Sequence, residues 1–404
     1  MSGQQAEQSV GEFSIGGSIH ARAPITVPAP PPDEEWDLPN GIAHVHYGEG
    51  NAGIRRPVLL ADGFNLGPSD LERLFRGLDG GEYTLLTHLR RSGRDVVLIG
   101  FGERSASLLD NAKTVTAAIQ RTIGERLGNT PLTVGGFSMG GIVARYVLAK
   151  LEAQGIDHQT ALYFSYDSPH RGAVVPIGLQ AFSSFIPSAN GFAQQMDSPA
   201  AREMLWRHYD PETGTVGVAP EREKFLAELR HVGFWPQRPR LLAVANGRGD
   251  GRGPAVPPGQ VALASVGERV CPGTTFYTQS EGHEVVVAEL KRLLPAAEKT
   301  VTTSGLPELD GAPGGTLAPY GILAAALERS GAEVELHHAE VCFVPTVSAV
   351  AIRDIDQPDD LYADVDGLPP GESDLDEFLC SSRTTAHTEI TEQLGSWLLD
   401  RLPY

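Results

Sequence analysis

The chain has 404 residues, of which 41% are hydrophobic, so it can bury a large core in one decorated domain or in two or three smaller ones. Its 51 acidic side chains outnumber 32 basic ones, and the net charge of -19 repels phosphate backbones and anionic membrane surfaces. This balance argues against nucleic acid as a partner and leaves the oligomeric state open.

Three cysteines, Cys271, Cys342 and Cys380, are too few and too scattered for a disulfide framework or a CxxC metal site, so we expect small buried side chains. The first residues lack the basic start and the apolar stretch of a secretory signal, and no later run is long enough to span a bilayer. We therefore expect a soluble, cytoplasmic protein without an integral membrane segment, although export that uses no such signal stays open.

Residues 1–40 end in a proline-rich and then acidic stretch, which predicts an extended, solvated N-terminal segment. The folded domain is expected to occupy residues 41–404. Within it, short β-rich runs bounded by turn residues alternate with helix-like segments. The first four runs are residues 57–61, 95–101, 132–137 and 161–166. This alternation predicts an α/β fold with a mostly parallel sheet flanked by helices.

Two later segments interrupt the alternation. Residues 174–239 are helix-like and mixed, and they predict a helical cap or lid. Residues 253–340 predict an additional insertion in the C-terminal half, with a β-like part at residues 261–278 and a helix at residues 285–294.

The strand pattern resumes after the predicted cap at residues 240–245. Residues 340–350 are expected to form the final buried strand, and residues 389–402 a closing amphipathic helix with one apolar face.

The sequence Gly-Phe-Ser-Met-Gly at residues 136–140 matches the G-x-S-x-G pattern. In that pattern the serine sits on a strained strand-to-helix turn with its hydroxyl exposed, and the glycines let the backbone turn without a clash. An apolar strand pattern precedes the motif here and a helical pattern follows it, as the motif requires. We therefore predict Ser138 as a nucleophile.

A serine hydroxyl is a poor nucleophile until a base takes its proton, so a histidine must converge on Ser138. Of the 12 histidines we favour His387, which lies in a polar loop just before the closing helix. The chain order of triads with this motif also places the histidine last. His170 lies beside a strand end and is expected to brace its own loop.

The base needs a carboxylate that orients it and stabilises the imidazolium, and two positions qualify. Asp167 ends the strand at residues 161–166, and Asp250 follows the strand at residues 240–245 within a glycine-rich stretch. We lean to Asp167, because a Ser-Pro turn restricts the chain next to it. Asp250 stays open as the alternative.

Acyl transfer needs two backbone donors for the negative oxygen of its transition state, one from the residue after the serine and one from the loop after an early strand. Met139 supplies the first amide. The run at residues 57–61 leads into Asp62-Gly63-Phe64-Asn65, so the amide of Phe64, or that of Asn65, is placed for the second.

On these segments the chain resembles bacterial α/β-hydrolases of the serine esterase and lipase family. The resemblance rests on residues 59–64, on residues 135–141 and on residues 167–173, which are similar to the P-H-x-G segment of many lipases. Residues 343–349 are similar to the strand before the histidine loop of the family, and this similarity implies His387 as the base.

Two features depart from that family. Its usual His-Gly pair before the oxyanion loop is Asp62-Gly63 here, and no Asp precedes Val344-Pro345, where several lipases keep their acid. The position of Asp250 is the commoner one for the acid in this fold, whereas a minority of lipase-like members use the earlier one.

Motifs and resemblance together predict an α/β-hydrolase fold and a serine hydrolase that cleaves carboxylic esters through a Ser-His-Asp triad and an acyl-enzyme. The expected substrate is a small-molecule or lipid-like ester. The same triad would serve a thioesterase, an acyltransferase, a polyester depolymerase or an amidase, and a non-catalytic binding protein could keep the fold. The chemistry requires no cofactor and no metal, and His44 with His46 lacks a nearby third ligand.

Overall fold

The computed structural model describes residues 28–186 and 191–403. Its centre is an eight-stranded sheet with the strand order β1-β2-β4-β3-β5-β6-β9-β17. The pairs β1–β2 and β2–β4 are antiparallel, and the other five neighbouring pairs are parallel. The strands are β1 (Glu34–Leu38), β2 (Gly41–His46), β3 (Pro57–Ala61), β4 (Asp95–Phe101), β5 (Leu132–Phe137), β6 (Thr160–Tyr166), β9 (Arg240–Arg248) and β17 (Glu377–Ser381).

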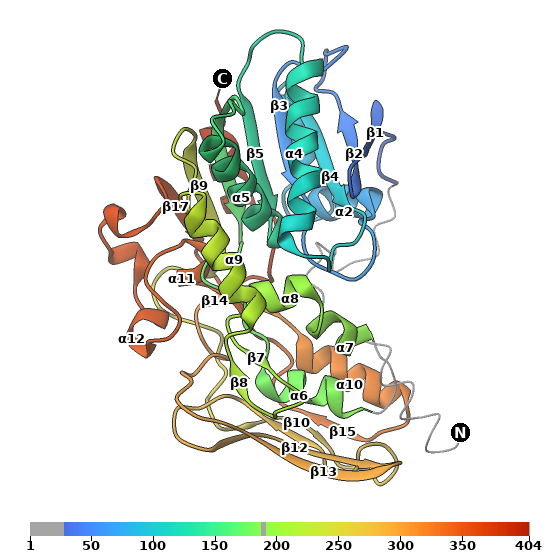
Figure 1. Ribbon diagram of the computed structural model, residues 1–404. Coiled ribbons are helices and arrows are strands. Elements are labelled where there is room, and N and C mark those ends of the chain that lie inside the picture. The colour runs from blue at the N-terminus through green and yellow to red at the C-terminus, as the bar shows by residue number, and fades with distance from the viewer. Residues whose placement is uncertain (1–27, 187–190, 404) are drawn as a thin grey trace.

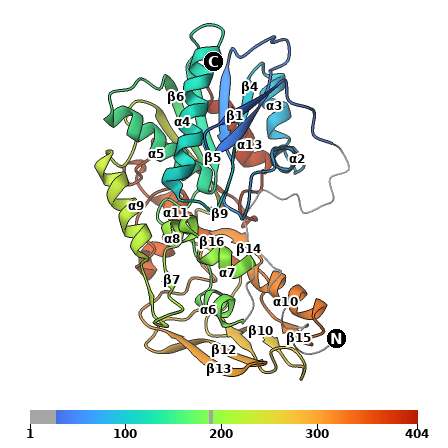
Figure 2. The same ribbon diagram turned by 45° about the vertical axis from the view of Figure 1, so that its right-hand side comes forward.

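Helices cover both faces of this sheet (Figure 1, Figure 2). They are α2 (Leu71–Asp79), α3 (Leu85–Arg91) and α13 (Glu392–Arg401) on one face, and α4 (Leu108–Glu125) and α5 (Met139–Ala153) on the other. Successive strand residues point to opposite faces, so Val58 and Leu60 pack with the first group, and Leu59 and Ala61 with the second. Because both faces of the sheet are covered, these strands appear in the sequence as continuous hydrophobic runs.

This mostly parallel sheet between two helical layers, with a strand-turn-helix junction from β5 to α5, is the α/β-hydrolase fold. The strands predicted at residues 57–61, 95–101 and 132–137 are confirmed with the same bounds. Those predicted at residues 161–166 and 240–245 are confirmed as the slightly longer β6 and β9.

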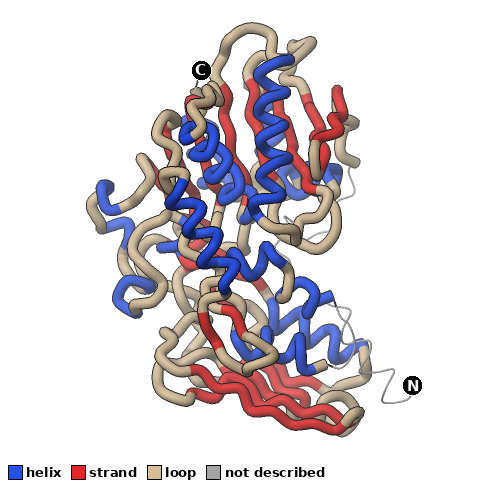
Figure 3. Tube along the Cα trace, viewed as in Figure 1, coloured by secondary structure: helices blue, strands red, loops and turns tan. Residues whose placement is uncertain are grey.

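A second layer lies at the end of the sheet where α4 begins (Figure 1, Figure 3). Between β6 and β9 the chain forms α6 (Ile177–Phe185), α7 (Gly191–Met196), α8 (Pro199–Met204), β7 (His208–Tyr209), β8 (Val216–Gly217) and α9 (Pro220–His231). After β9 it forms a five-stranded antiparallel sheet in the order β13-β12-β11-β10-β15. The strands are β10 (Val261–Ser265), β11 (Thr275–Tyr277), β12 (Val285–Leu293), β13 (Ala296–Thr303) and β15 (Val334–Leu336), and α10 (Pro319–Arg329) precedes β15.

The two segments of this layer pack on each other. The ring of Phe182 in α6 lies 5.4 Å from that of Phe276 in β11. Gly178 in α6 lies so close to β12 that a β-carbon there would come within 2.7 Å of the carbonyl of Val287. The predicted cap and the predicted insertion therefore share one hydrophobic core.

Two predictions about this part of the chain are wrong. The helix predicted at residues 285–294 is instead strand β12, Val285–Leu293, which pairs with β13 in a hairpin. The strand expected at residues 340–350 is the shorter β16 (Val341–Pro345), which pairs with β14 (Gly314–Leu317) outside the central sheet. Residues 346–349 then form a short helix, α11 (Thr346–Ala349).

The last strand of the central sheet is β17, which the sequence analysis did not predict. It follows an irregular stretch with α12 (Pro358–Leu361) and two 3₁₀ helices, Val365–Gly367 and Pro370–Glu372. The closing helix is confirmed as α13.

The N-terminal prediction needs one correction. Residues 34–38, assigned to an extended segment, form strand β1 at the edge of the central sheet. Residues 1–27 of that segment lie outside the described residues. None of the helices in the described ranges has the length and apolar character needed to cross a membrane.

Candidate active site

Ser138 occupies the sharp turn between β5 and α5, with φ 53° and ψ -121°. A non-glycine residue rarely adopts a positive φ, so the surrounding contacts must hold this conformation. Two glycines make these contacts possible. A β-carbon on Gly136 would overlap the backbone of Gly140, and one on Gly140 would overlap the carbonyl groups of Ala61 and Asp62. The motif therefore forms a sharp turn from strand to helix.

This turn is tied to the end of the neighbouring strand β6. The Ser138 amide donates a hydrogen bond of 2.9 Å to the carbonyl of Tyr166, and the next residue is Asp167. Asp167 is buried, and its backbone also has a positive φ, of 48°. Its Oδ1 accepts a hydrogen bond of 2.9 Å from the amide of Asn246 at the end of β9.

His387 meets the second oxygen of this carboxylate. Its Nδ1 lies 2.7 Å from Oδ2 of Asp167, which fixes the ring orientation and favours the tautomer with the proton on Nδ1. The His387 amide donates to the carbonyl of Thr316, over 2.8 Å. Nε2 is buried and has no hydrogen-bond partner among the described residues. It is therefore the ring atom left to accept a proton.

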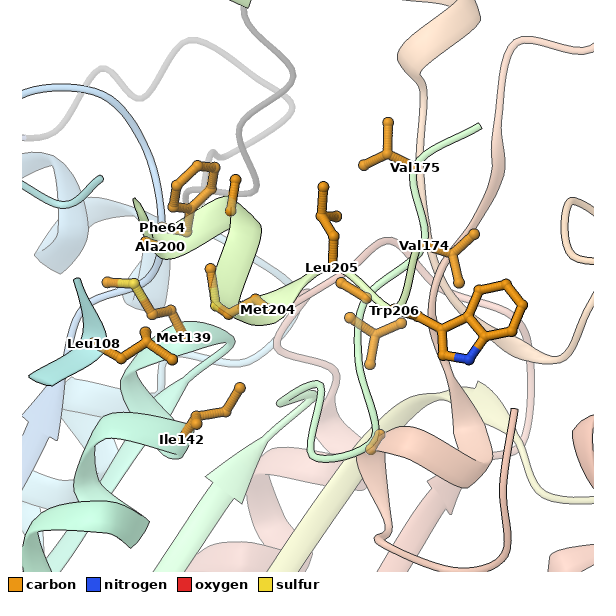
Figure 4. Close-up of a cluster of buried hydrophobic side chains, with 14 of the residues drawn as sticks. Phe64, Leu108, Met139, Ile142, Val174, Val175, Ala200, Met204, Leu205 and Trp206 are labelled. Atoms are coloured by element: carbon orange, nitrogen blue, oxygen red, sulfur yellow. The ribbon is translucent and has the colours of Figure 1, made fainter. Parts of the chain in front are cut away.

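An apolar cavity lies beside Ser138. Ser138 lines it, and the ring of Phe343, which also lines it, lies 4.9 Å from the ring of His387. The space amounts to about 380 Å³, including its open mouth. The other lining residues are Phe64, Pro169, Ala173, Val175, Met196, Ala201, Met204 and Leu205. Figure 4 shows Phe64, Met204 and Leu205 of this wall, with the buried Met139 at the start of α5 near Phe64 and Met204.

Of the two predicted oxyanion donors, Phe64 lines this cavity, and Met139 directly follows Ser138, which also lines it. Met139 is the first residue of α5, where backbone amides lack an acceptor within the helix. Phe64 lines the cavity beside Ser138, and no hydrogen bond from its amide is found within the described part of the chain. The preceding amide, that of Gly63, donates to Oδ1 of Asp62 over 2.7 Å.

The structure does not bring Asp250 to His387. Asp250 lies in the loop after β9, where its Oδ1 accepts a hydrogen bond of 2.9 Å from Nε of Arg248. Arg252 lies 3.8 Å away. The hydrogen bond from Arg248 is the main cause that lowers the pKa of the Asp250 carboxyl to about 2. Arg248 and Arg252, in the same loop, therefore already offset the charge of the Asp250 carboxylate.

His170 braces its loop, as predicted. Its Nε2 lies 2.9 Å from Oγ of Ser165, and its ring packs 4.9 Å from that of Trp235. Burial is the main cause that lowers its pKa well below the usual value, so the ring is neutral. In residues 28–186 and 191–403, no group of three or more His, Cys, Asp or Glu side chains is arranged to hold a metal ion.

Sequence reasoning missed the residues that hold the acid and the base in place. Asn246 donates to Asp167, and its Nδ2 donates to Thr385 Oγ1 over 2.7 Å in the histidine loop. Gly315 in β14 lies against Asp167, where a β-carbon would overlap the carboxylate. The only sequence signal for Gly315 was a Gly-Gly pair in a turn-rich stretch, and such a pair is typical of an ordinary loop.

No protein-family model and no curated protein matches the sequence. Solved structures of similar fold include a mature lipase from Bacillus licheniformis, with 13% identity, 51% of this chain and 72% of that chain covered, and a TM-score of 0.32. An esterase from Pyrobaculum calidifontis has 14% identity, 60% and 70% coverage, and a TM-score of 0.31. A bacterial heroin esterase has 15% identity, 52% and 65% coverage, and a TM-score of 0.33. At such values the likeness concerns the fold, and the case for an activity depends on the site.

Proposed function

We propose that the protein is a serine hydrolase that cleaves carboxylic esters, with Ser138 as nucleophile, His387 as base and Asp167 as the carboxylate that orients the base. The observation that carries the proposal is the buried hydrogen bond between His387 and Asp167 next to a serine held at positive φ. Strained backbone and a buried carboxylate beside an apolar cavity are costly features that concentrate at functional sites.

The reaction follows from the roles of these groups. Oγ of Ser138 attacks the ester carbonyl while Nε2 of His387 accepts its proton, and the carbonyl oxygen becomes negative between the amides of Met139 and Phe64. His387 then gives the proton to the leaving alcohol, which departs and leaves an acyl-enzyme. Water attacks the acyl group, with His387 again as the base, and Ser138 regains its proton as the acid is released.

The cavity indicates the chemistry of the acyl group. All its lining side chains other than that of Ser138 are apolar, and none is charged. A charged acyl group would lose its hydration there without compensation, so the site favours an uncharged, apolar one. Thioesters, amides and polyesters would use the same residues, and a comparison of leaving groups on one acyl chain will assign the preferred bond.

Turnover of p-nitrophenyl butyrate tests the proposal. We expect wild-type turnover and a loss of about 10³-fold or more in kcat for Ser138→Ala and for His387→Ala, because each removes a group that acts in every step. Ser304→Ala and His337→Ala are the matched controls, since both side chains are exposed and lie in the insertion. Full activity of Ser138→Ala would contradict the proposal.

A further inference from the structure

The loop after β3 carries a buried carboxylate that the reaction does not use. Asp62 is 2% exposed. Its Oδ1 accepts the Gly63 amide over 2.7 Å, and its Oδ2 accepts Oγ of Ser69 over 2.7 Å. Arg104 approaches the same Oδ2 to 3.8 Å. The carboxylate therefore joins the two ends of the loop that contains Phe64.

Arg104 extends this network to the middle of the loop. Its guanidinium donates to the carbonyl of Leu66 over 3.0 Å and to that of Gly67 over 3.3 Å. Next to it, the carboxylate of Glu103 accepts the Gly67 amide over 2.9 Å. These contacts fix both sides of the loop to the segment that follows β4. A loop held at both ends and in its middle by these polar contacts has little freedom to move its amides.

The direction of two consecutive amides follows from this geometry. The Gly63 amide is turned back onto Asp62 and is not available to a ligand. The next amide, that of Phe64, has no acceptor in the described part of the chain, and the Phe64 side chain lines the cavity with Ser138. Oxyanion donors act because they are fixed before charge develops.

Charge balance explains why Arg104 accompanies Asp62. A lone carboxylate two residues from the donor would repel the developing oxyanion in a cavity with apolar walls. Arg104 offsets that charge. Burial is the largest influence on the Asp62 carboxyl and raises its pKa, while Arg104, Ser69 and the Gly63 amide act in the opposite direction.

We propose that Asp62, neutralised by Arg104, is a positioning residue that presents the Phe64 amide to the oxyanion. This inference rests on the proposed ester hydrolysis. It assigns to the Asp-Gly pair the role of fixing the conformation of the loop. Because the charges of Asp62 and Arg104 offset each other, removing the cation alone should lower kcat more than removing both charges.

A double-mutant cycle in the full-length protein tests this unit through kcat and KM for p-nitrophenyl butyrate. We expect Asp62→Asn to lower kcat about tenfold with little change in KM, because a misdirected donor affects the transition state more than substrate binding. Arg104→Met leaves a buried charge unpaired and is expected to lower kcat about a hundredfold. The double variant should regain about tenfold over Arg104→Met. Asp37→Asn, at an exposed aspartate in β1, is the control.

Thermal unfolding of each variant separates positioning from folding. If Arg104→Met does not fold, Ser69→Ala replaces it, because it removes one donor to Asp62 and should lower kcat with little change in KM. A double variant no more active than Arg104→Met, or full kcat in Asp62→Asn, overturns the inference while the wild type still turns over ester. An inactive wild type that no serine-directed probe labels overturns the proposed function, and this inference with it.

Discussion

Nδ1 of His387 lies 2.7 Å from Oδ2 of Asp167, although 220 positions separate the two residues in the chain. The sheet order explains the contact, because β9 stands between β6, which ends just before Asp167, and β17, which leads into the histidine loop. Asn246 at the end of β9 bonds to Asp167 and to that loop. The acid at the earlier strand end is therefore the one that the histidine reaches.

The choice between the two candidate acids can be tested by paired substitutions. We expect Asp167→Asn to lower kcat about 10³- to 10⁴-fold, because the histidine loses its tautomer preference and the stabilisation of its charged form. Asp250→Asn should leave kcat unchanged, since Asp250 is paired with Arg248 in its own loop. Steady-state kinetics of both variants shows which substitution lowers kcat. A larger loss in Asp250→Asn than in Asp167→Asn would assign the role of orienting His387 to Asp250.

Gly315 offers a test that leaves every proposed catalytic side chain in place. A β-carbon at this position would overlap the Asp167 carboxylate and come within 3.1 Å of Asn246. Gly315→Ala should therefore push the carboxylate away from His387 and lower kcat about tenfold or more. Gly124→Ala is the control, because nothing lies within 4 Å of a β-carbon there. Unchanged kcat in Gly315→Ala would show that the carboxylate position is not critical.

Glu203 fixes the wall of the cavity that α8 supplies. Its carboxylate accepts Oγ of Ser107 over 2.7 Å and the amide of Leu108 over 2.6 Å, at the N-terminus of α4. Glu203→Ala should cost about 1–2 kcal/mol of stability by removing this capping interaction. It should also shift the ester preference toward longer acyl chains, because Met204 is no longer held against the site. Thermal unfolding and an acyl-chain series from C2 to C12 measure both effects, with exposed Glu223→Ala as the control.

Asp310 predicts a pH dependence of stability. It is 2% exposed, its Oδ2 accepts the Gln279 amide over 2.6 Å, and its Oδ1 has no partner among the described residues. Burial raises the pKa of its carboxyl to about 6. Because the folded pKa lies above the unfolded one, the stability that this group contributes is present at acid pH and is lost as the pH rises through about 6.

Asp310→Asn removes that titration. We expect the variant to have a higher Tm than the wild type at pH 8, where the buried carboxylate is ionised, by up to about 3 kcal/mol in free energy of unfolding. At pH 5, which lies between the unfolded and the folded pKa, the advantage should be about half as large, and it should vanish only below about pH 4. Thermal unfolding of the variant and the wild type at both pH values measures this difference in stability. An equal difference at pH 5 and pH 8 would show that the titration of Asp310 does not affect stability.

The sequence predicted five strands of the central sheet, β3, β4, β5, β6 and β9, because these strands are buried on both faces. Val58 to Ala61 is apolar at every position, and β5 is buried throughout with Thr133 as its one polar residue, so neither run fits an amphipathic helix. The sharp turn at Ser138 was also predictable, since its glycines meet a steric need within a few residues. Both features can be predicted because they depend on residues close together in the sequence and not on distant contacts.

Prediction failed where distant contacts decide. Strand β12 mixes apolar and charged residues, and its alternation breaks at Val287 and Ala288, both buried, beside a register shift against β13. Such a run fits a helix as well as a strand until its partner is known. The choice between Asp167 and Asp250 also depends on a distant contact. It could not be made from the sequence, because it is decided by which strand end the histidine loop crosses.

Covalent labelling tests the central claim most directly. The wild type is treated with a fluorophosphonate, and intact-mass and peptide mass spectrometry locate the adduct. The proposed mechanism predicts a single adduct on Ser138, lost in Ser138→Ala and strongly slowed in His387→Ala and Asp167→Asn. An adduct on another residue, or labelling that persists in Ser138→Ala, would contradict it.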